Sequence, residues 1–228
     1  MPLSLNTRAV GDVTIVRCIG RIVAGGETES LREHITGLRQ DRSAFVLHLG
    51  EVAFIDSSGL GTLVRLLTST RRGRGDLKLC NVPQAVDKVL QITNLTTLFD
   101  THPSEEDAVS AFYKRKSTWE RAAIAGPSVL CVDQSADVLA YLRELLRSAG
   151  YNVLTNSSLP DSLILMKATR PSLTVLGPNL KASPGTQQAF RAACSTVPVV
   201  ELGSEFSTLD AGQAASDLLE RIRARLQS

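Results

Sequence analysis

Apolar residues follow two different spacings along this chain. Short runs rich in β-branched residues predict buried strands, and stretches with an apolar residue every three or four positions predict amphipathic helices. The two patterns alternate, which indicates an α/β fold. In the first half they predict strands at 13–22, 45–49 and 77–81, and helices at 27–40, 60–72, 83–90 and 105–113.

The second half repeats the alternation more regularly. The pattern predicts a flavodoxin-like, doubly wound parallel sheet with a shortened or missing fifth strand. The stretch between the halves is basic, lacks strand periodicity and ends in Gly126-Pro127, which indicates a linker. We therefore expect domains at 1–113 and 127–228, joined by a linker at 114–126. In the second domain, strands are predicted at 128–132, 151–154, 173–176 and 198–202, and helices at 137–149, 160–168, 187–194 and 213–226.

Composition narrows the function classes. The chain is 43% hydrophobic and 21% charged, which is typical of globular domains. A net charge of only +2 and 4% aromatic residues argue against direct nucleic-acid binding, which needs a basic face or stacking surfaces. No signal peptide or membrane-spanning run is visible, so we expect a cytoplasmic protein. The four cysteines, Cys18, Cys80, Cys131 and Cys194, have no metal-ligand spacing and are expected to be reduced. Cys18, Cys80 and Cys131 lie in apolar, strand-like runs, where a cysteine is usually buried.

The most informative segment runs from Phe54 to Gly61, with the sequence F-I-D-S-S-G-L-G. Here a strand ends, a polar turn follows and a helix begins, so Asp56 or Ser57 can cap the helix. The serine hydroxyls are expected at the positive end of the helix dipole. A phosphate added there brings about −1.5 to −2 charges next to Asp56 and would disrupt an interface shaped for a neutral serine. On the residues alone, a helix cap with no further role is the competing interpretation.

In its context, this segment resembles the signature of STAS-domain anti-sigma factor antagonists. The family motif follows a strand of the form V-L-x-L, and Val46-Leu47-His48-Leu49 precedes it here. Three further features fit the family pattern: Gly20, which ends its second strand, Leu77–Asn81, and the helix after Pro83. The resemblance covers about residues 3–113 and implies the STAS α/β fold. One departure is Val23, which stands near a position where family members often carry an aspartate.

The resemblance implies a partner-switching function in signal transduction and transcription regulation. The partner is an anti-sigma factor that is also a serine kinase, and a PP2C-type phosphatase resets the switch. The phosphorylated serine would be Ser57, with Ser58 as the alternative. The kinase supplies the ATP chemistry, so we expect no enzymatic activity, no catalytic residue and no cofactor in this bacterial-type phosphoprotein. The partner-binding residues would be Asp56, Ser57, Ser58, Gly59, Leu60 and Gly61.

The second half resembles a response-regulator receiver domain that has lost its chemistry. The run Val129–Asp133 fits the first receiver strand, but Gln134 follows where a second metal-binding acid is usual. Gly177 stands in place of the phosphoacceptor aspartate, and Gly203 stands where a hydroxyl residue is expected. We therefore expect a pseudo-receiver that binds partners or self-associates. No metal site is predicted; Asp133 is a weak candidate, and a structural role in a turn is favoured for it.

Three alternatives stay open at this stage. The chain could be a scaffold of a larger sensory assembly, with homo-oligomers expected. It could be a response regulator with a STAS output, although Gly177 argues against this. It could also be a STAS subunit of a lipid transport system, but those usually consist of the single domain. The cognate kinase, the sigma factor and the input signal are not identified by the residues.

Overall fold

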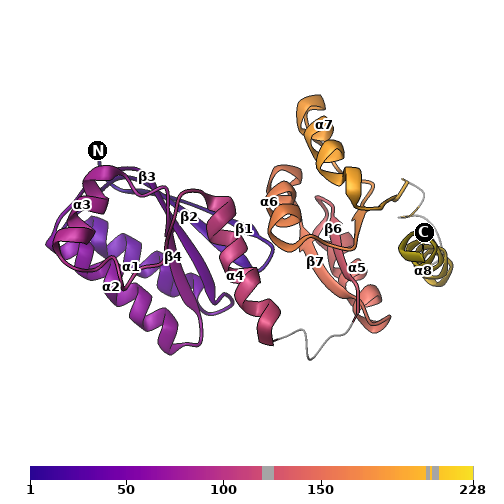
Figure 1. Cartoon of the computed structure of the whole chain (residues 1–228), viewed down its shortest axis with the longest axis horizontal. Helices are drawn as coiled ribbons and strands as arrows, with labels where there is room; N and C mark the ends of the chain where they lie inside the picture. The colour runs from indigo at the N-terminus through magenta and orange to yellow at the C-terminus, as the bar shows by residue number, and fades with distance from the viewer. Residues whose placement is uncertain (120–125, 204–205, 207–210, 228) are drawn as a thin grey trace. The chain divides into compact units, whose positions relative to one another are not determined.

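The chain forms two compact units, Met1–Phe112 and Tyr113–Ser228, each with its own sheet (Figure 1). The computed structural model describes residues 1–119, 126–203, 206 and 211–227.

The sheet of the first unit has the strand order β1-β2-β3-β4-β5. Strand β1 pairs antiparallel with β2, and the other neighbours pair in parallel. The parallel strands β2, β3 and β4 therefore end at the same edge, and the turns that follow them meet there. The strands are β1 (Ser4–Val10), β2 (Val13–Ile22), β3 (Ala44–Ile55), β4 (Asp76–Cys80) and β5 (Thr101–His102).

Helices cover both faces of this sheet. On one face, Leu77 and Leu79 of β4 share a core with buried residues of α1, α2 and α3. On the other face, the ammonium group of Lys78 lies 5.0 Å from the ring centre of Phe112 in α4, so α4 packs on the opposite side (Figure 1). The helices are α1 (Gly26–Leu38), α2 (Ser57–Arg72), α3 (Gln84–Ile92) and α4 (Glu105–Trp119).

Several boundaries differ from the sequence-based expectation. Strands β1 and β5 were not predicted, because β1 is largely exposed and polar and β5 has only two residues. Strand β3 continues to Ile55, beyond its expected end at Leu49. Helix α4 extends to Trp119 and so occupies the first part of the expected linker; residues 120–125 of that linker lie outside the described residues.

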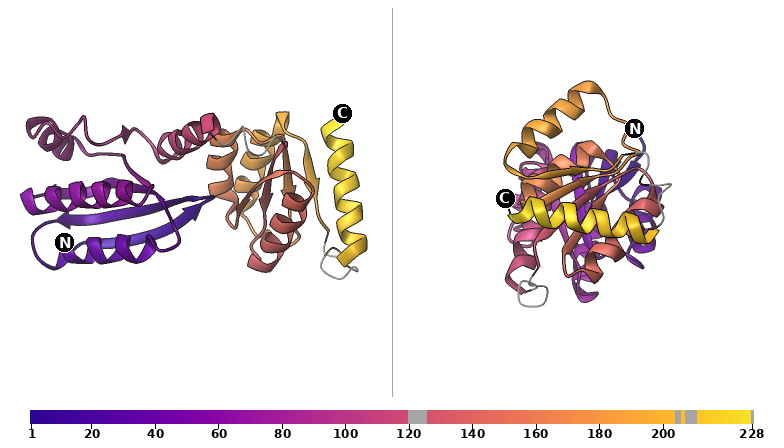
Figure 2. Two further views of the ribbon diagram at one scale, coloured as in Figure 1. Left: turned by 90° about the horizontal axis from the view of Figure 1, so that it is seen from below. Right: turned by 90° about the vertical axis from the view of Figure 1, so that its right-hand side faces the viewer.

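The second unit contains a parallel four-stranded sheet in the order β7-β6-β8-β9. Buried residues of α5 and α8 share one core with the sheet, whereas α6 and α7 pack against each other on the other side (Figure 1). Helix α8 runs beside the last strand of the sheet (Figure 2). The elements are β6 (Ser128–Val132), α5 (Ala136–Ser148), β7 (Asn152–Asn156), α6 (Leu159–Thr169), β8 (Leu173–Leu176), α7 (Pro184–Ala193), a 3₁₀ turn (Cys194–Thr196), β9 (Val199–Glu201) and α8 (Ala211–Gln227).

All four cysteines are free and buried, as expected for Cys18, Cys80 and Cys131 from their apolar surroundings. Burial raises the pKa of the Cys18 and Cys131 thiols to about 12, so both stay protonated and unreactive at neutral pH. Among the described residues, no helix has the length and apolar character needed to cross a membrane.

Candidate functional site

The site centres on the junction between β3 and α2, at the edge where the parallel strands end. Asp56 is the N-cap residue of α2, and its Oδ1 accepts a hydrogen bond from the backbone N–H of Gly59 at 2.7 Å. Its Oδ2 accepts a second bond from the N–H of Ala24 at 2.9 Å. The backbone N–H of Asp56 donates to the carbonyl of Ile22 at 3.3 Å. One carboxylate thus ties the start of α2 to the turn between β2 and α1.

These hydrogen bonds also determine the charge of Asp56. Donation from the N–H of Ala24, followed by that of Gly59, lowers the pKa of the Asp56 carboxyl. Asp56 is therefore ionised at neutral pH and sits at the positive end of the helix dipole, where a negative charge is favoured.

Ser57 and Ser58 are the first two residues of α2, and both are exposed. The backbone N–H groups of a first helical turn have no partners within the helix, so this is a place where an added phosphate can be accommodated without unfolding the helix. The geometry allows a modification that changes surface charge but leaves the fold intact.

The remaining motif residues divide between interior and surface. Gly59 is buried, and a β-carbon there would overlap the carbonyl oxygen of Ile22 and lie 2.9 Å from Cγ1 of Ile55. Leu60 is buried in the core. Gly61 is exposed, and a β-carbon there would meet nothing within 4 Å. Gly59 and Leu60 therefore position the site, whereas Gly61 lies on its surface with the two serines.

Phe54 is a surface feature that the sequence interpretation missed. It lies near the end of β3 and is 53% exposed, one of three large apolar side chains with high exposure among the described residues. An exposed aromatic ring two residues before Asp56 adds apolar area to the same edge. One sequence feature indicates this exposure. Phe54 lies between Ala53 and Ile55 in a strand, and successive strand residues point to opposite faces, so Phe54 points away from the buried side that Ile55 occupies.

In the second unit, Asp133 is fully buried at the end of β6. Its Oδ1 accepts from the N–H of Ser135 at 2.6 Å, and its Oδ2 accepts from the N–H of Asn179 at 2.9 Å. The carboxylate therefore joins the loop after β6 to the loop after β8. Among the described residues, no group of three or more His, Cys, Asp or Glu side chains is placed to hold a metal ion.

Gly177 lies directly against this carboxylate. A β-carbon at Gly177 would overlap Oδ2 of Asp133 and lie 2.6 Å from its Cγ. The carboxylate of Asp133 thus occupies the space that any side chain at position 177 would enter. The contact between Asp133 and Gly177 is therefore structural, and it leaves no room for a second acidic side chain at position 177.

Comparisons with known proteins agree with this description of the first unit. Residues 4–108 match the STAS domain. BtrV of Bordetella bronchiseptica, whose name places it among anti-sigma factor antagonists, is 26% identical over 102 residues, which are 44% of this chain and 88% of BtrV. The anti-sigma-B factor antagonist of Bacillus subtilis is 29% identical over 79 residues, 35% of this chain and 72% of that protein. The first unit is therefore similar to STAS domains over residues 4–108.

A further relative is the transcriptional regulatory protein PrrA of Mycobacterium leprae. It is 36% identical over 89 residues, which are 38% of this chain and 38% of PrrA. The chain thus matches well under half the length of this relative, and the activity of the whole of PrrA is not carried over.

Proposed function

We propose that the chain is a signalling adaptor of the anti-sigma factor antagonist type, switched off by phosphorylation of Ser57. The STAS match over residues 4–108 and the two antagonists among its relatives support the general role. The observation that carries the proposal is the exposure of Ser57 at the first position of α2, beside an anchored carboxylate. In this proposal the partner is an anti-sigma factor that is also a serine kinase, and a phosphatase removes the phosphate.

The switch would act on the surface and not on the fold. A phosphate on Ser57 would lie beside the ionised Asp56, so about three negative charges would gather at one helix end. The helix dipole and free N–H groups tolerate this charge, and α2 would stay folded. A partner that contacts Ser57, Gly61 and Phe54 would have to desolvate that charge or pair with it. Binding would therefore weaken while the STAS domain remains intact.

Direct phosphorylation tests this proposal. The kinase would be isolated by crosslinking to the unphosphorylated chain in its native cells, purified, and incubated with ATP and each variant. We expect Ser57→Ala to abolish labelling and Ser58→Ala to retain it. Phosphorylation should weaken binding to the kinase by about tenfold or more, because a new charge at an interface must be desolvated. Equal labelling of the Ser57→Ala/Ser58→Ala double variant and the unmodified chain would refute the proposal.

The second unit is proposed to be a receiver-like binding module without phosphotransfer. Its strand order corresponds to the first four positions of the flavodoxin-like order 2-1-3-4-5. Gly177 supplies no carboxylate, and the neighbouring Asp133 is held by two backbone N–H groups. These features support a structural role for Asp133 and Gly177 instead of phosphoryl transfer. They argue against a response regulator that is phosphorylated in this unit.

A further inference from the structure

Strand β9 has an outer edge with no pairing strand among the described residues. The N–H of Thr174 donates to the carbonyl of Pro198, and the N–H of Leu202 donates to the carbonyl of Leu176. In a parallel ladder alternate residues point to the same neighbour, so the main-chain groups of Val199 and Glu201 point away from β8. This edge is where a fifth strand of the fold would pair.

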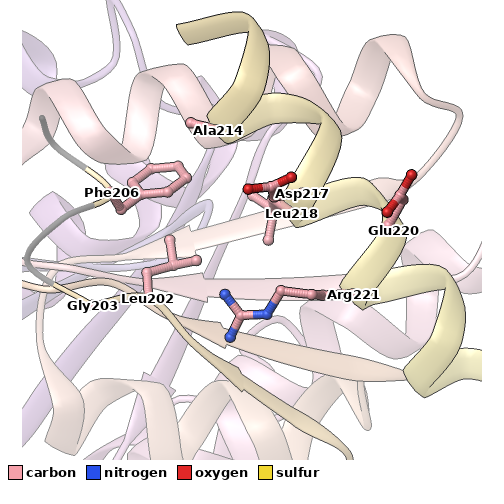
Figure 3. A pocket seen from close by; sticks show the side chains of 8 residues that line it. All are labelled: Leu202, Gly203, Phe206, Ala214, Asp217, Leu218, Glu220 and Arg221. Carbon is pink, nitrogen blue, oxygen red and sulfur yellow. The ribbon is translucent and has the colours of Figure 1, made fainter. Parts of the chain in front are cut away.

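Arg221 of α8 makes one of the hydrogen bonds that such a fifth strand would make. Its Nη2 donates to the outward carbonyl of Glu201 at 2.7 Å. Two hollows of about 350 and 510 Å³ lie along the same edge, and Arg221 lines both. Figure 3 shows the first of them, with Leu202, Phe206 and Leu218 near one another and Arg221 beside the strands. An exposed edge flanked by open volume is a template for another strand.

The side of α8 that lines the hollows carries a charge gradient. Asp217 and Glu220 line the first hollow, and Arg225 lines the second, with Arg221 between them. A two-fold axis brings the same surface of two copies together, with the two α8 helices running in opposite directions. Under such an axis the acidic part of one helix meets the basic part of the other, so the surface is complementary to itself.

We infer that this edge binds a second copy of the chain through antiparallel pairing of β9 with β9. With the axis at Val200, the outward groups of Val199 in one copy pair with those of Glu201 in the other. Arg221 releases the Glu201 carbonyl and pairs with Glu220 of the second copy. Asp217 lies opposite Arg225 of the second copy. The inference concerns the second unit alone and does not depend on the proposed switch at Ser57.

Sedimentation velocity and native mass spectrometry of the full chain test the inference. We expect a dimer at about 100 µM, a concentration that populates even weak interfaces. Val199→Pro removes an outward N–H and should yield a monomer. Thr155→Pro is the matched control on the opposite edge, since Asn152 and Asn156 pair with the β6 side and leave the Thr155 main chain pointing outward. It should leave the dimer intact.

A charge exchange identifies the surface without a backbone change. The variants Asp217→Arg/Glu220→Arg and Arg221→Glu/Arg225→Glu should each be monomeric, and their mixture should form a heterodimer. Arg223→Glu is the control, because Arg223 is an exposed residue of the same helix that lines neither hollow. A monomeric unmodified chain would overturn the inference. A dimer that persists in Val199→Pro and in both charge variants would also overturn it.

Discussion

Two glycines of α2 should respond in opposite ways to the same substitution. A β-carbon at Gly59 would overlap a backbone carbonyl oxygen, that of Ile22, and would lie 2.9 Å from the carbonyl carbon. Backbone atoms cannot rotate away, so α2 must shift relative to β2. A β-carbon at Gly61 has no neighbour within 4 Å. The two positions differ by two residues in one helix, so each is a control for the other.

The magnitudes follow from these contacts. Overpacking of a core position costs roughly 1–3 kcal/mol, so Gly59→Ala should destabilise the first unit by about that amount. Replacing glycine by alanine within an unobstructed helix stabilises by roughly 0.5–1 kcal/mol, so Gly61→Ala should be neutral or stabilising. The two variants should therefore differ by about 1–4 kcal/mol in the free energy of unfolding.

Amide hydrogen exchange measured against urea concentration is the assay for this pair. Peptides that cover α2 report unfolding of the first unit independently of the second. Gly59→Ala should lower the urea midpoint of these peptides, and Gly61→Ala should not. Equal midpoints for the two variants would show that Gly59 does not pack closely against Ile22. Since Gly61 lies on the proposed partner surface, Gly61→Ala should weaken kinase binding although stability is kept.

Three further substitutions test separate parts of the account. Hydrogen bonds lower the pKa of Asp56, so its stabilising effect is complete above the ordinary carboxyl pKa near 4 and is lost as the pH falls through the lowered value. Urea titrations should therefore show that the difference in stability between the unmodified chain and Asp56→Asn shrinks between about pH 6 and pH 3. A constant difference would contradict this prediction. Asp133→Ala removes the acceptor of the backbone N–H groups of Ser135 and Asn179 and should destabilise the second unit by roughly 0.5–1.5 kcal/mol per lost hydrogen bond in the same exchange assay. The exposed Asp137→Ala should not, and equal stability of the two variants would refute the role of Asp133. Phe54→Ser should weaken kinase binding in a titration without lowering stability. Its control is Ile92→Ser, which alters an apolar side chain that is 83% exposed at the end of α3. Equal affinities of the two variants would show that Phe54 is not part of the partner surface.

The alternation of strands and helices was predictable because most elements bury one regular apolar face. Helix α2 is a clear case, since Asp56, one of the two predicted cap residues, caps it and Leu63 and Leu67 are fully buried. Strand β1 was missed because only its last residue, Val10, is buried. A strand stabilised by main-chain pairing to one neighbour leaves little hydrophobic pattern.

The segment that forms the site could be predicted from the sequence. Which of its residues pack against the core and which are exposed could not. The motif predicts a helix capped by Asp56 or Ser57, but spacing alone does not show that Gly59 packs against Ile22 whereas Gly61 is open. That difference arises from the packing of α2 on β2, which are far apart in the sequence. The contact between Asp133 and Gly177 depends in the same way on two loops that meet only in the folded unit.

The proposed switch depends on a regulatory phosphate on Ser57. Peptide mass spectrometry of the chain isolated from its native cells under several growth conditions tests it most directly, with a Ser57→Ala strain as the control. We predict a phosphopeptide with the phosphate on Ser57 in at least one condition, absent from the control strain. A chain that carries no phosphate in any condition, or carries it only outside the Asp56–Gly61 segment, would contradict the account and leave Asp56 and Ser57 as a helix cap.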